Sequence, residues 1–317
     1  MIYILYIICA IIIVLLSNKA SVYVDLLDKK TSLSGAFIGG VMLSAVTSLP
    51  ELFTSLTSTV WLDKPSLCLG NILGSNLFNL LILAVLILIF FKGFSTAKVA
   101  KSHIIVSISI ILIYLFMMLN LQNSFPLEFL TINVTSIIII LLYMYGVKHM
   151  AADESENNEE DISNLTVKQV IFRFILVSIG IVGVSIAITY VTDIIADEEH
   201  LNLGAGLAGA LFLGIATSLP ELSSTVALFK IKNYNIAIGN IIGSCLFNFT
   251  ILSLADIFYF KPGGIYDFSI DPKNLNLLIL GPIATLAMAI MFKFKNKYTQ
   301  AICSLVVIAS YILFLVI

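Results

Sequence analysis

Two glutamates occupy the same place in two copies of one phrase. Thr47-Ser48-Leu49-Pro50-Glu51-Leu52 returns as Thr217-Ser218-Leu219-Pro220-Glu221-Leu222. Each glutamate lies inside a long apolar segment, where a carboxylate is costly and therefore indicates a functional position. The threonine four residues earlier shares its helix face. Carboxylate and hydroxyl oxygens are ligands for hard cations, and two glutamates would balance one divalent ion such as calcium.

A second phrase is also repeated. Gly70-Asn71-Ile72-Leu73-Gly74-Ser75 returns as Gly239-Asn240-Ile241-Ile242-Gly243-Ser244. Glycines four residues apart let two helices approach closely, which favours a packing role. Each asparagine shares a helix face with the serine four residues later, and an asparagine oxygen can also contact an ion. Packing and ion binding are therefore both expected of this phrase.

A proline interrupts the helix that carries each glutamate. We expect Pro50 to free the carbonyl of Val46 and to loosen that of Thr47, and Pro220 to act alike in the second copy. In hydrocarbon, a freed carbonyl must be satisfied by protein, water or an ion. Serines extend the face of Glu51 along the span, at Ser44, Ser48, Ser55 and Ser58.

The composition defines the class of protein that surrounds these residues. The 317 residues are 59% hydrophobic and 11% charged, with a mean hydropathy of +1.06. Soluble domains carry about 25% charged residues, so this is an integral membrane protein. No basic run indicates nucleic acid, and the four cysteines form no C-x-x-C pair that would indicate a disulfide framework or zinc. No cofactor is expected.

Ten apolar segments are long enough to be predicted as membrane-spanning helices. They are 2–17, 33–60, 66–91, 103–120, 128–147, 168–192, 202–229, 235–259, 275–292 and 299–316. The two phrases recur at a nearly constant offset, 170 residues (217 minus 47) and 169 (240 minus 71), which indicates a duplication. We therefore expect a five-helix repeat at 1–148, an acidic linker at 149–167 and a second five-helix repeat at 168–317.

The basic residues predict the orientation. Fourteen lie on one set of alternate connections, and Lys64, Lys261 and Lys273 lie on the other, which accounts for all seventeen. Basic residues favour the cytoplasmic side, so both termini are expected outside the cell membrane and the central linker in the cytoplasm. Five spans are an odd number, so the second repeat enters the membrane inverted. Inverted repeats are typical of secondary transporters.

Three polar or aromatic stretches outside the spans allow simpler interpretations. The acidic linker is expected to be a solvated hinge, and a regulatory cation sensor is the alternative, although no EF-hand spacing is present. The stretch 197–200 either ends a helix or gathers cations at an outer mouth. Aromatic residues near the end of the eighth span are expected to form an interfacial belt, at Tyr259, Phe260, Tyr266 and Phe268.

The doubled T-S-L-P-E and G-N-x-x-G-S motifs resemble the calcium/cation antiporter superfamily, the sodium/calcium exchanger-like membrane proteins. The resemblance implies a monomeric unit that exchanges calcium for sodium by alternating access. It implies that the glutamates are the central calcium ligands and that the threonines offer backbone carbonyls. The implied ion-site residues are Thr47, Glu51, Asn71, Thr217, Glu221 and Asn240. The implied secondary positions are Ser44, Ser48, Ser75, Gly214, Ser218 and Ser244.

The sequence departs from that family pattern at three kinds of position. Many sodium-coupled members carry an aspartate in one half, whereas Asn71 and Asn240 stand here in both. A serine often precedes that position by four residues, where this chain has Leu67 and Ile236, and Cys245 replaces the last asparagine of one phrase. Protons are therefore the alternative counter-ion, although the G-N-x-x-E pattern typical of proton/calcium exchangers is absent.

Other classes of protein fit the sequence less well. The three histidines, His103, His149 and His200, belong to no catalytic motif, so an enzyme is not expected. A cation channel would also use polar stripes along its helices. A cation sensor that does not transport is the remaining alternative, because altered coupling residues can accompany a loss of exchange.

Overall fold

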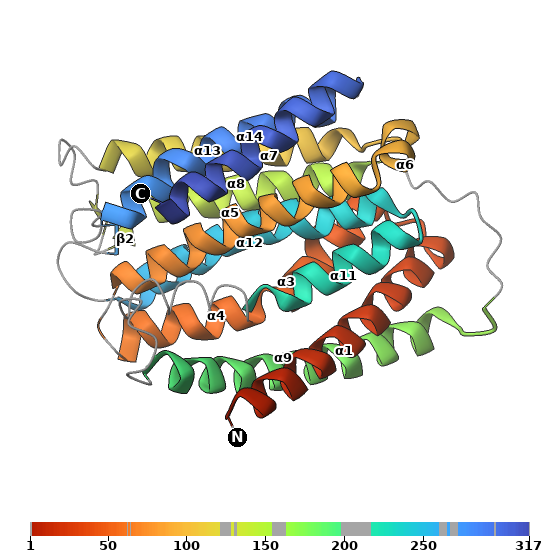
Figure 1. The fold of residues 1–317 in the computed structure, drawn as a ribbon, viewed down its shortest axis with the longest axis horizontal. Helices are drawn as coiled ribbons and strands as arrows, with labels where there is room; N and C mark the ends of the chain where they lie inside the picture. Colours follow the sequence, from red (N-terminus) through yellow and green to blue (C-terminus); the bar gives the residue numbers. More distant parts are fainter. Residues whose placement is uncertain are drawn as a thin grey trace.

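The computed structural model describes residues 2–61, 63, 65–120, 128–129, 132–153, 163–197, 217–259, 265–266, 272–294 and 296–316. Within these ranges the chain is almost entirely helical, and its long helices run roughly side by side (Figure 1). Eight described helices are long and apolar enough to cross a membrane, and one bent pair forms a ninth span. The predicted fold class, an all-α membrane protein with two inverted five-helix repeats and proline-interrupted helices, is confirmed.

The first repeat contains four continuous spans and one broken span. Its long helices are α1 (Ile2–Lys30), α5 (Pro65–Ile89), α7 (Lys101–Asn120) and α8 (Val134–Ala152). The broken span consists of α2 (Gly35–Phe37), η1 (Ile38–Leu43), α3 (Ser44–Thr47), α4 (Leu49–Leu56) and η2 (Thr57–Trp61). The two η segments are wide π-helical turns, which are frequent at functional sites. The short helix α6 (Phe91–Thr96) follows α5.

The second repeat is described over four of its spans and part of the fifth. The long helices are α9 (Val167–Asp197), α12 (Tyr234–Phe258), α13 (Pro272–Lys293) and α14 (Lys297–Val316). The span predicted at 202–229 is described only from Thr217, and it contains α11 (Leu219–Lys230). Gly214, the acidic residues of 154–162 and residues 198–200 lie outside the described residues.

Two predicted boundaries were wrong for identifiable reasons. The first span was predicted to end at 17, but α1 continues to Lys30, because polar residues end an apolar run without ending the helix. The fifth span was predicted from 128, but α8 begins at Val134. Before it, β1 (Glu128–Phe129) pairs with β2 (Ile132–Asn133) as an antiparallel hairpin, and Asn133 then caps α8.

The broken span lies between a peripheral helix pair and the main bundle (Figure 1). Helices α1 and α9 pack against each other along one edge, and both also contact segments of the broken span. Helix α12 is buried over 72% of its most apolar stretch and α1 over 17%, so α12 is central and α1 is largely exposed. Helix α12 contacts η1, α3, α4, α5 and α11. This arrangement places both repeated phrases at the centre of the molecule.

Candidate ion-binding site

The two helix breaks have the same backbone geometry. Ser48 has φ −91° and ψ 7°, and Ser218 has φ −91° and ψ 5°. Each proline lies in the first turn of the helix that starts after the break, where its missing N–H costs no helical hydrogen bond. The helix is therefore divided at the serine, not kinked around an internal proline. In the first repeat the two parts are bent by 44°.

Each glutamate faces the break of the opposite repeat. The Ser48 hydroxyl donates a hydrogen bond of 3.2 Å to Oε1 of Glu221, which also interacts with Thr47. Glu51 faces the equivalent pair in the second repeat, Thr217 and Ser218, although its oxygens form no hydrogen bond with a described residue. The two carboxylates also interact electrostatically with each other, and both side chains are fully buried. The inverted repeats thus bring two acids and four hydroxyl-bearing residues together.

The carboxylates retain free acceptor capacity. Both oxygens of Glu51 and Oε2 of Glu221 have no hydrogen-bond partner among the described residues. Two buried carboxylates with unused oxygens repel each other and require compensation by positive charge. No three His, Cys, Asp or Glu side chains cluster anywhere in the described part of the chain. A cation bound here would therefore have two acidic residues and neutral oxygens as ligands.

Both asparagines of the second phrase are held in place through their amide nitrogens. Nδ2 of Asn240 donates to Ser224 at 2.9 Å and to Thr225 at 3.0 Å. Its Oδ1 lies 3.4 Å from the Thr47 hydroxyl, on the opposite repeat. In the first repeat, Nδ2 of Asn71 donates to Ser55 at 3.1 Å. Because the nitrogens are occupied by hydroxyls, the amide oxygens remain available to an ion.

The secondary positions differ in what their hydroxyl groups contact. Ser244 lies 3.5 Å from the Thr47 hydroxyl, and Ser218 and Ser75 are buried without a partner among the described residues. Ser44 instead donates to the carbonyl of Gly40, four residues earlier in its own span, at 2.7 Å. The structure does not describe Gly214.

An amide cluster that was not predicted from the sequence also joins the two repeats. Nδ2 of Asn76 donates to the carbonyl of Cys245 at 3.2 Å, and Nδ2 of Asn248 donates to Oδ1 of Asn76 at 2.9 Å. Cys245 in turn interacts electrostatically with Glu221. The sequence does indicate these asparagines, because the repeat of the second phrase continues as far as Asn79 and Asn248. Ser224, which fixes Asn240, was also missed.

The expected packing role of the glycines is observed in the second repeat. A Cβ atom at Gly243 would lie 2.3 Å from the carbonyl oxygen of Gly40, and one at Gly239 would lie 2.9 Å from the Gly40 nitrogen. Helix α12 therefore touches the backbone of η1 directly. This contact holds Asn240 and Ser244 against the first repeat, so packing and site geometry depend on the same residues.

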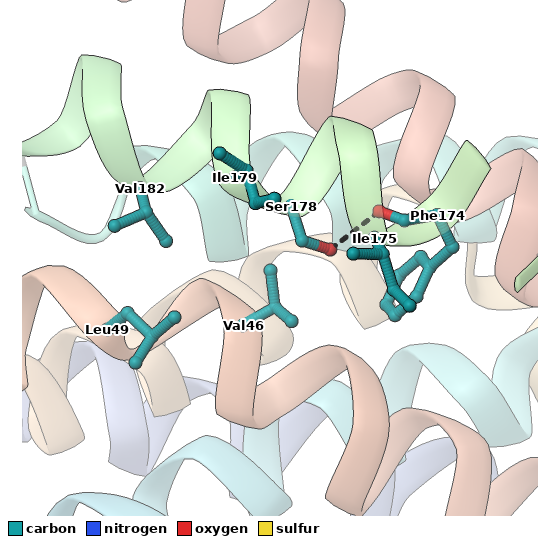
Figure 2. Close-up of a pocket in the computed structure, with 7 residues that line it drawn as sticks. All are labelled: Val46, Leu49, Phe174, Ile175, Ser178, Ile179 and Val182. Atoms are coloured by element: carbon teal, nitrogen blue, oxygen red, sulfur yellow. Dashed lines mark hydrogen bonds between the residues drawn. The ribbon is translucent and has the colours of Figure 1, made fainter. Parts of the chain in front are cut away.

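An apolar crevice separates the break from α9. Figure 2 shows its two walls, with Val46 and Leu49 beside the break and α9 residues opposite, in a cavity of about 250 Å³. The α9 lining residues are Phe174, Ile175, Ser178, Ile179 and Val182. The only hydroxyl of this lining, on Ser178, donates to the Phe174 carbonyl of its own helix at 2.8 Å. The crevice therefore offers no ion ligands and no polar link across it.

Inverted repeats whose broken helices bring two buried acids together define a secondary transporter of cations. The chain matches the family model described as "Sodium/calcium exchanger protein" over residues 1–148 and 170–317. It therefore belongs to the sodium/calcium exchanger family. It is accordingly a multi-pass membrane antiporter of cations and not an enzyme.

Other proteins resemble this chain in sequence or in fold. An uncharacterized membrane protein of Methanocaldococcus jannaschii is 28% identical over 272 residues, which cover 85% of this chain and 81% of that protein. The sodium-calcium exchanger NCX_Mj soaked with 10 mM Na⁺ and zero Ca²⁺ has a TM-score of 0.71 at 20% identity, covering 99% and 98% of the two chains. With 2.5 mM Na⁺ and 0.1 mM Sr²⁺ the TM-score is 0.72 at 19% identity, with the same coverage. These structures share the fold.

Proposed function

We propose that this protein exchanges calcium for sodium across the cell membrane by alternating access and exports calcium from the cytoplasm. The observation that carries the proposal is the pair of buried glutamates, each facing the helix break of the opposite repeat with unused oxygens. Glu51 and Glu221 are the central calcium ligands. The Thr47 and Thr217 carbonyls, with the Asn71 and Asn240 amides, complete the site.

The charge and the ligand chemistry both favour calcium. Two carboxylates neutralise one divalent cation, and the hydroxyl, amide and carbonyl oxygens around them are hard ligands. Calcium accepts six to eight oxygens in flexible geometry, whereas magnesium requires a strict octahedron and gives up its water reluctantly. A site assembled from two separate repeats suits the more flexible coordination.

Alternating access follows from the burial of the site. Neither glutamate has exposed surface, so an ion reaches them only when the surrounding helices rearrange. Helix α9, which packs against α1, borders the break across the apolar crevice of Figure 2, where the lining side chains form no polar link that a movement would break. We infer that this pair moves against the bundle and opens the site to one side at a time.

We propose that this movement takes place in a chain arranged as the sequence predicts. The repeats are residues 1–148 and 168–317, and the acidic segment 149–167 connects them in the cytoplasm. Both termini then lie outside, and one chain is the transport unit. The basic residues support this orientation, since fourteen of the seventeen fall on the side of the central connection.

Protons are a second candidate counter-ion because of two apolar positions. Leu67 and Ile236 lie one helical turn before Asn71 and Asn240. Leu67 is 49% exposed, and Ile236 is fully buried with its backbone against Gly39. Neither side chain gives an oxygen to the site, which leaves fewer ligands for sodium. A proton needs only the glutamates themselves.

Calcium flux in proteoliposomes tests the proposal. Purified protein is reconstituted, and uptake of radioactive calcium is measured with a sodium gradient, with a proton gradient and with neither. Uptake driven by sodium supports the first candidate, and uptake driven only by protons supports the second. Uptake that needs no counter-gradient indicates a channel. Calcium binding without uptake in any condition indicates a sensor.

A further inference from the structure

We propose that a cavity at one end of the helix bundle, remote from the glutamates in sequence, binds an anionic phospholipid through three lysines. The cavity has about 480 Å³ and lies between α6, which follows α5, and the turn that joins α11 to α12 (Figure 1). Lys92 comes from the first repeat, and Lys230 and Lys232 come from the second. The inference goes beyond the proposed function and does not depend on which ions are exchanged.

The charge around this cavity is of one sign. Its lining contains three exposed lysines and no acid, and none of the three ammonium groups has a hydrogen bond or an ion pair with a described residue. Asp25 and Asp28 approach the same turn, but Asn233 donates to both, at 2.9 and 3.2 Å, and Asp25 also pairs with Lys29. Three positive charges without a protein partner favour a phosphate group, which lysine binds well.

The backbone of Lys232 is an independent indication. Helix α11 ends in a Schellman motif, in which the N–H of Asn233 donates to the Leu228 carbonyl at 3.0 Å. The N–H of Lys232 donates to the Phe229 carbonyl at 3.1 Å, and Lys232 has φ 63°, in the left-handed region that glycine favours. A lysine costs conformational energy here, which indicates a role for its side chain. The preference of basic residues for the cytoplasmic side does not account for this backbone.

The aromatic wall of the cavity joins the two repeats. The ring of Phe90 lies 5.7 Å from that of Phe229, and Phe229 packs edge-on against Tyr234 at 5.3 Å. A Cβ atom at Gly93 would collide with the Tyr234 hydroxyl, so α6 packs directly on the start of α12. A ligand in this cavity would therefore contact elements of both repeats and stabilise their association.

The surroundings of the lysines favour a lipid over a soluble anion. Ile89 lines the cavity and is 67% exposed, and Ile231, between two of the lysines, is 50% exposed. In a membrane protein such side chains face the hydrocarbon, whereas lysines at helix ends reach the headgroups. A phospholipid can place its phosphate among the ammonium groups and its acyl chains over the isoleucines.

Short-chain phosphatidylglycerol tests the proposal. The full-length protein in a neutral maltoside detergent is titrated with dioctanoyl phosphatidylglycerol, with dioctanoyl phosphatidylcholine and with inorganic phosphate, and its unfolding temperature is measured. A ligand that binds only the folded protein raises this temperature as its concentration rises. We expect a rise with phosphatidylglycerol alone. No rise with phosphatidylglycerol, or an equal rise with phosphatidylcholine or with inorganic phosphate, would overturn the proposal.

Lysine variants test whether this cavity is the site. Lys92→Gln and Lys230→Gln should each shift the midpoint of the phosphatidylglycerol titration about fivefold to higher concentration. Lys232→Gly should shift it by a similar factor without lowering the unfolding temperature in the absence of lipid, because glycine favours this backbone. The matched control is Lys168→Gln, which removes an exposed charge outside the cavity lining. Unchanged midpoints in all three cavity variants, or an equal shift in the control, would overturn the assignment.

Discussion

The hydroxyl of Ser48 donates a hydrogen bond of 3.2 Å to Glu221, 173 residues further along the chain. The donor is the residue at which one repeat breaks its helix, and the acceptor is the acid of the other repeat. Glu51 faces the corresponding residues of the other break, Thr217 and Ser218, without a hydrogen bond to a described residue. Each break therefore positions the carboxylate of its partner repeat, so neither repeat forms the site alone.

Replacing Ser48 by alanine should weaken calcium binding by about tenfold. A hydrogen bond to a charged group contributes about 1.5–3 kcal/mol, and 1.4 kcal/mol corresponds to tenfold in affinity. Titration calorimetry with calcium measures the effect, and Ser58→Ala is the control because the Ser58 hydroxyl donates to the Ser55 carbonyl of its own span and to no other described residue. Unchanged affinity in Ser48→Ala would contradict this interaction.

Replacing Gly243 by alanine should destabilise the fold by about 3 kcal/mol, because the new methyl group would collide with the Gly40 backbone. The destabilisation is measured by size-exclusion chromatography, as the amount of folded protein lost after heating. Gly183→Ala is the control, since no described atom lies within 4 Å of the added Cβ. Equal stability of the two variants would show that α12 does not pack directly on η1.

The amide cluster predicts opposite effects at two equivalent asparagines. Asn79 is buried with no partner for either amide atom among the described residues, so Asn79→Leu should raise stability by about 1 kcal/mol. Asn248 donates to Asn76, and Asn248→Leu leaves that oxygen unpaired, which should cost about 1–3 kcal/mol. Thermal unfolding of both variants in the same detergent measures this. A loss of stability of similar size in both would refute the asymmetry.

Filling the apolar crevice should slow transport without changing calcium affinity. Val182→Phe adds bulk on α9 opposite Val46 and Leu49, where the cavity has about 250 Å³ (Figure 2). A tighter contact between α9 and the break should reduce the rate of calcium uptake several-fold. Uptake in proteoliposomes and binding by calorimetry separate the two quantities. An unchanged rate would argue against movement of α9 at this crevice.

Much of the fold was predictable from the sequence because hydropathy and duplication are strong signals. The broken helices followed from Pro50 and Pro220, and the site followed from two acids in apolar segments. The length of α1 was not predictable, because its polar second half continues the same helix. Tyr266 was expected at the interface, but it is buried with its hydroxyl 2.7 Å from Ser136, a contact that depends on tertiary packing.

The pairing across the repeats could not be predicted from spacing. Spacing shows that Thr47 and Glu51 share a helix face, but only the packing of α12 on η1 places Thr47 near Asn240 and Ser244. The cluster of Asn76, Cys245 and Asn248 was overlooked for the same reason, since its contacts join helices 169 to 172 residues apart in sequence.

Equilibrium binding of radioactive calcium to the purified protein tests the central claim most directly. Wild-type protein, Glu51→Gln and Glu221→Gln are compared after each is shown to be folded by size-exclusion chromatography. The wild-type chain should bind one calcium ion, and either variant should bind none under the same conditions, because a single carboxylate neither balances nor holds a divalent ion. Wild-type binding in either glutamine variant would contradict a shared two-glutamate site.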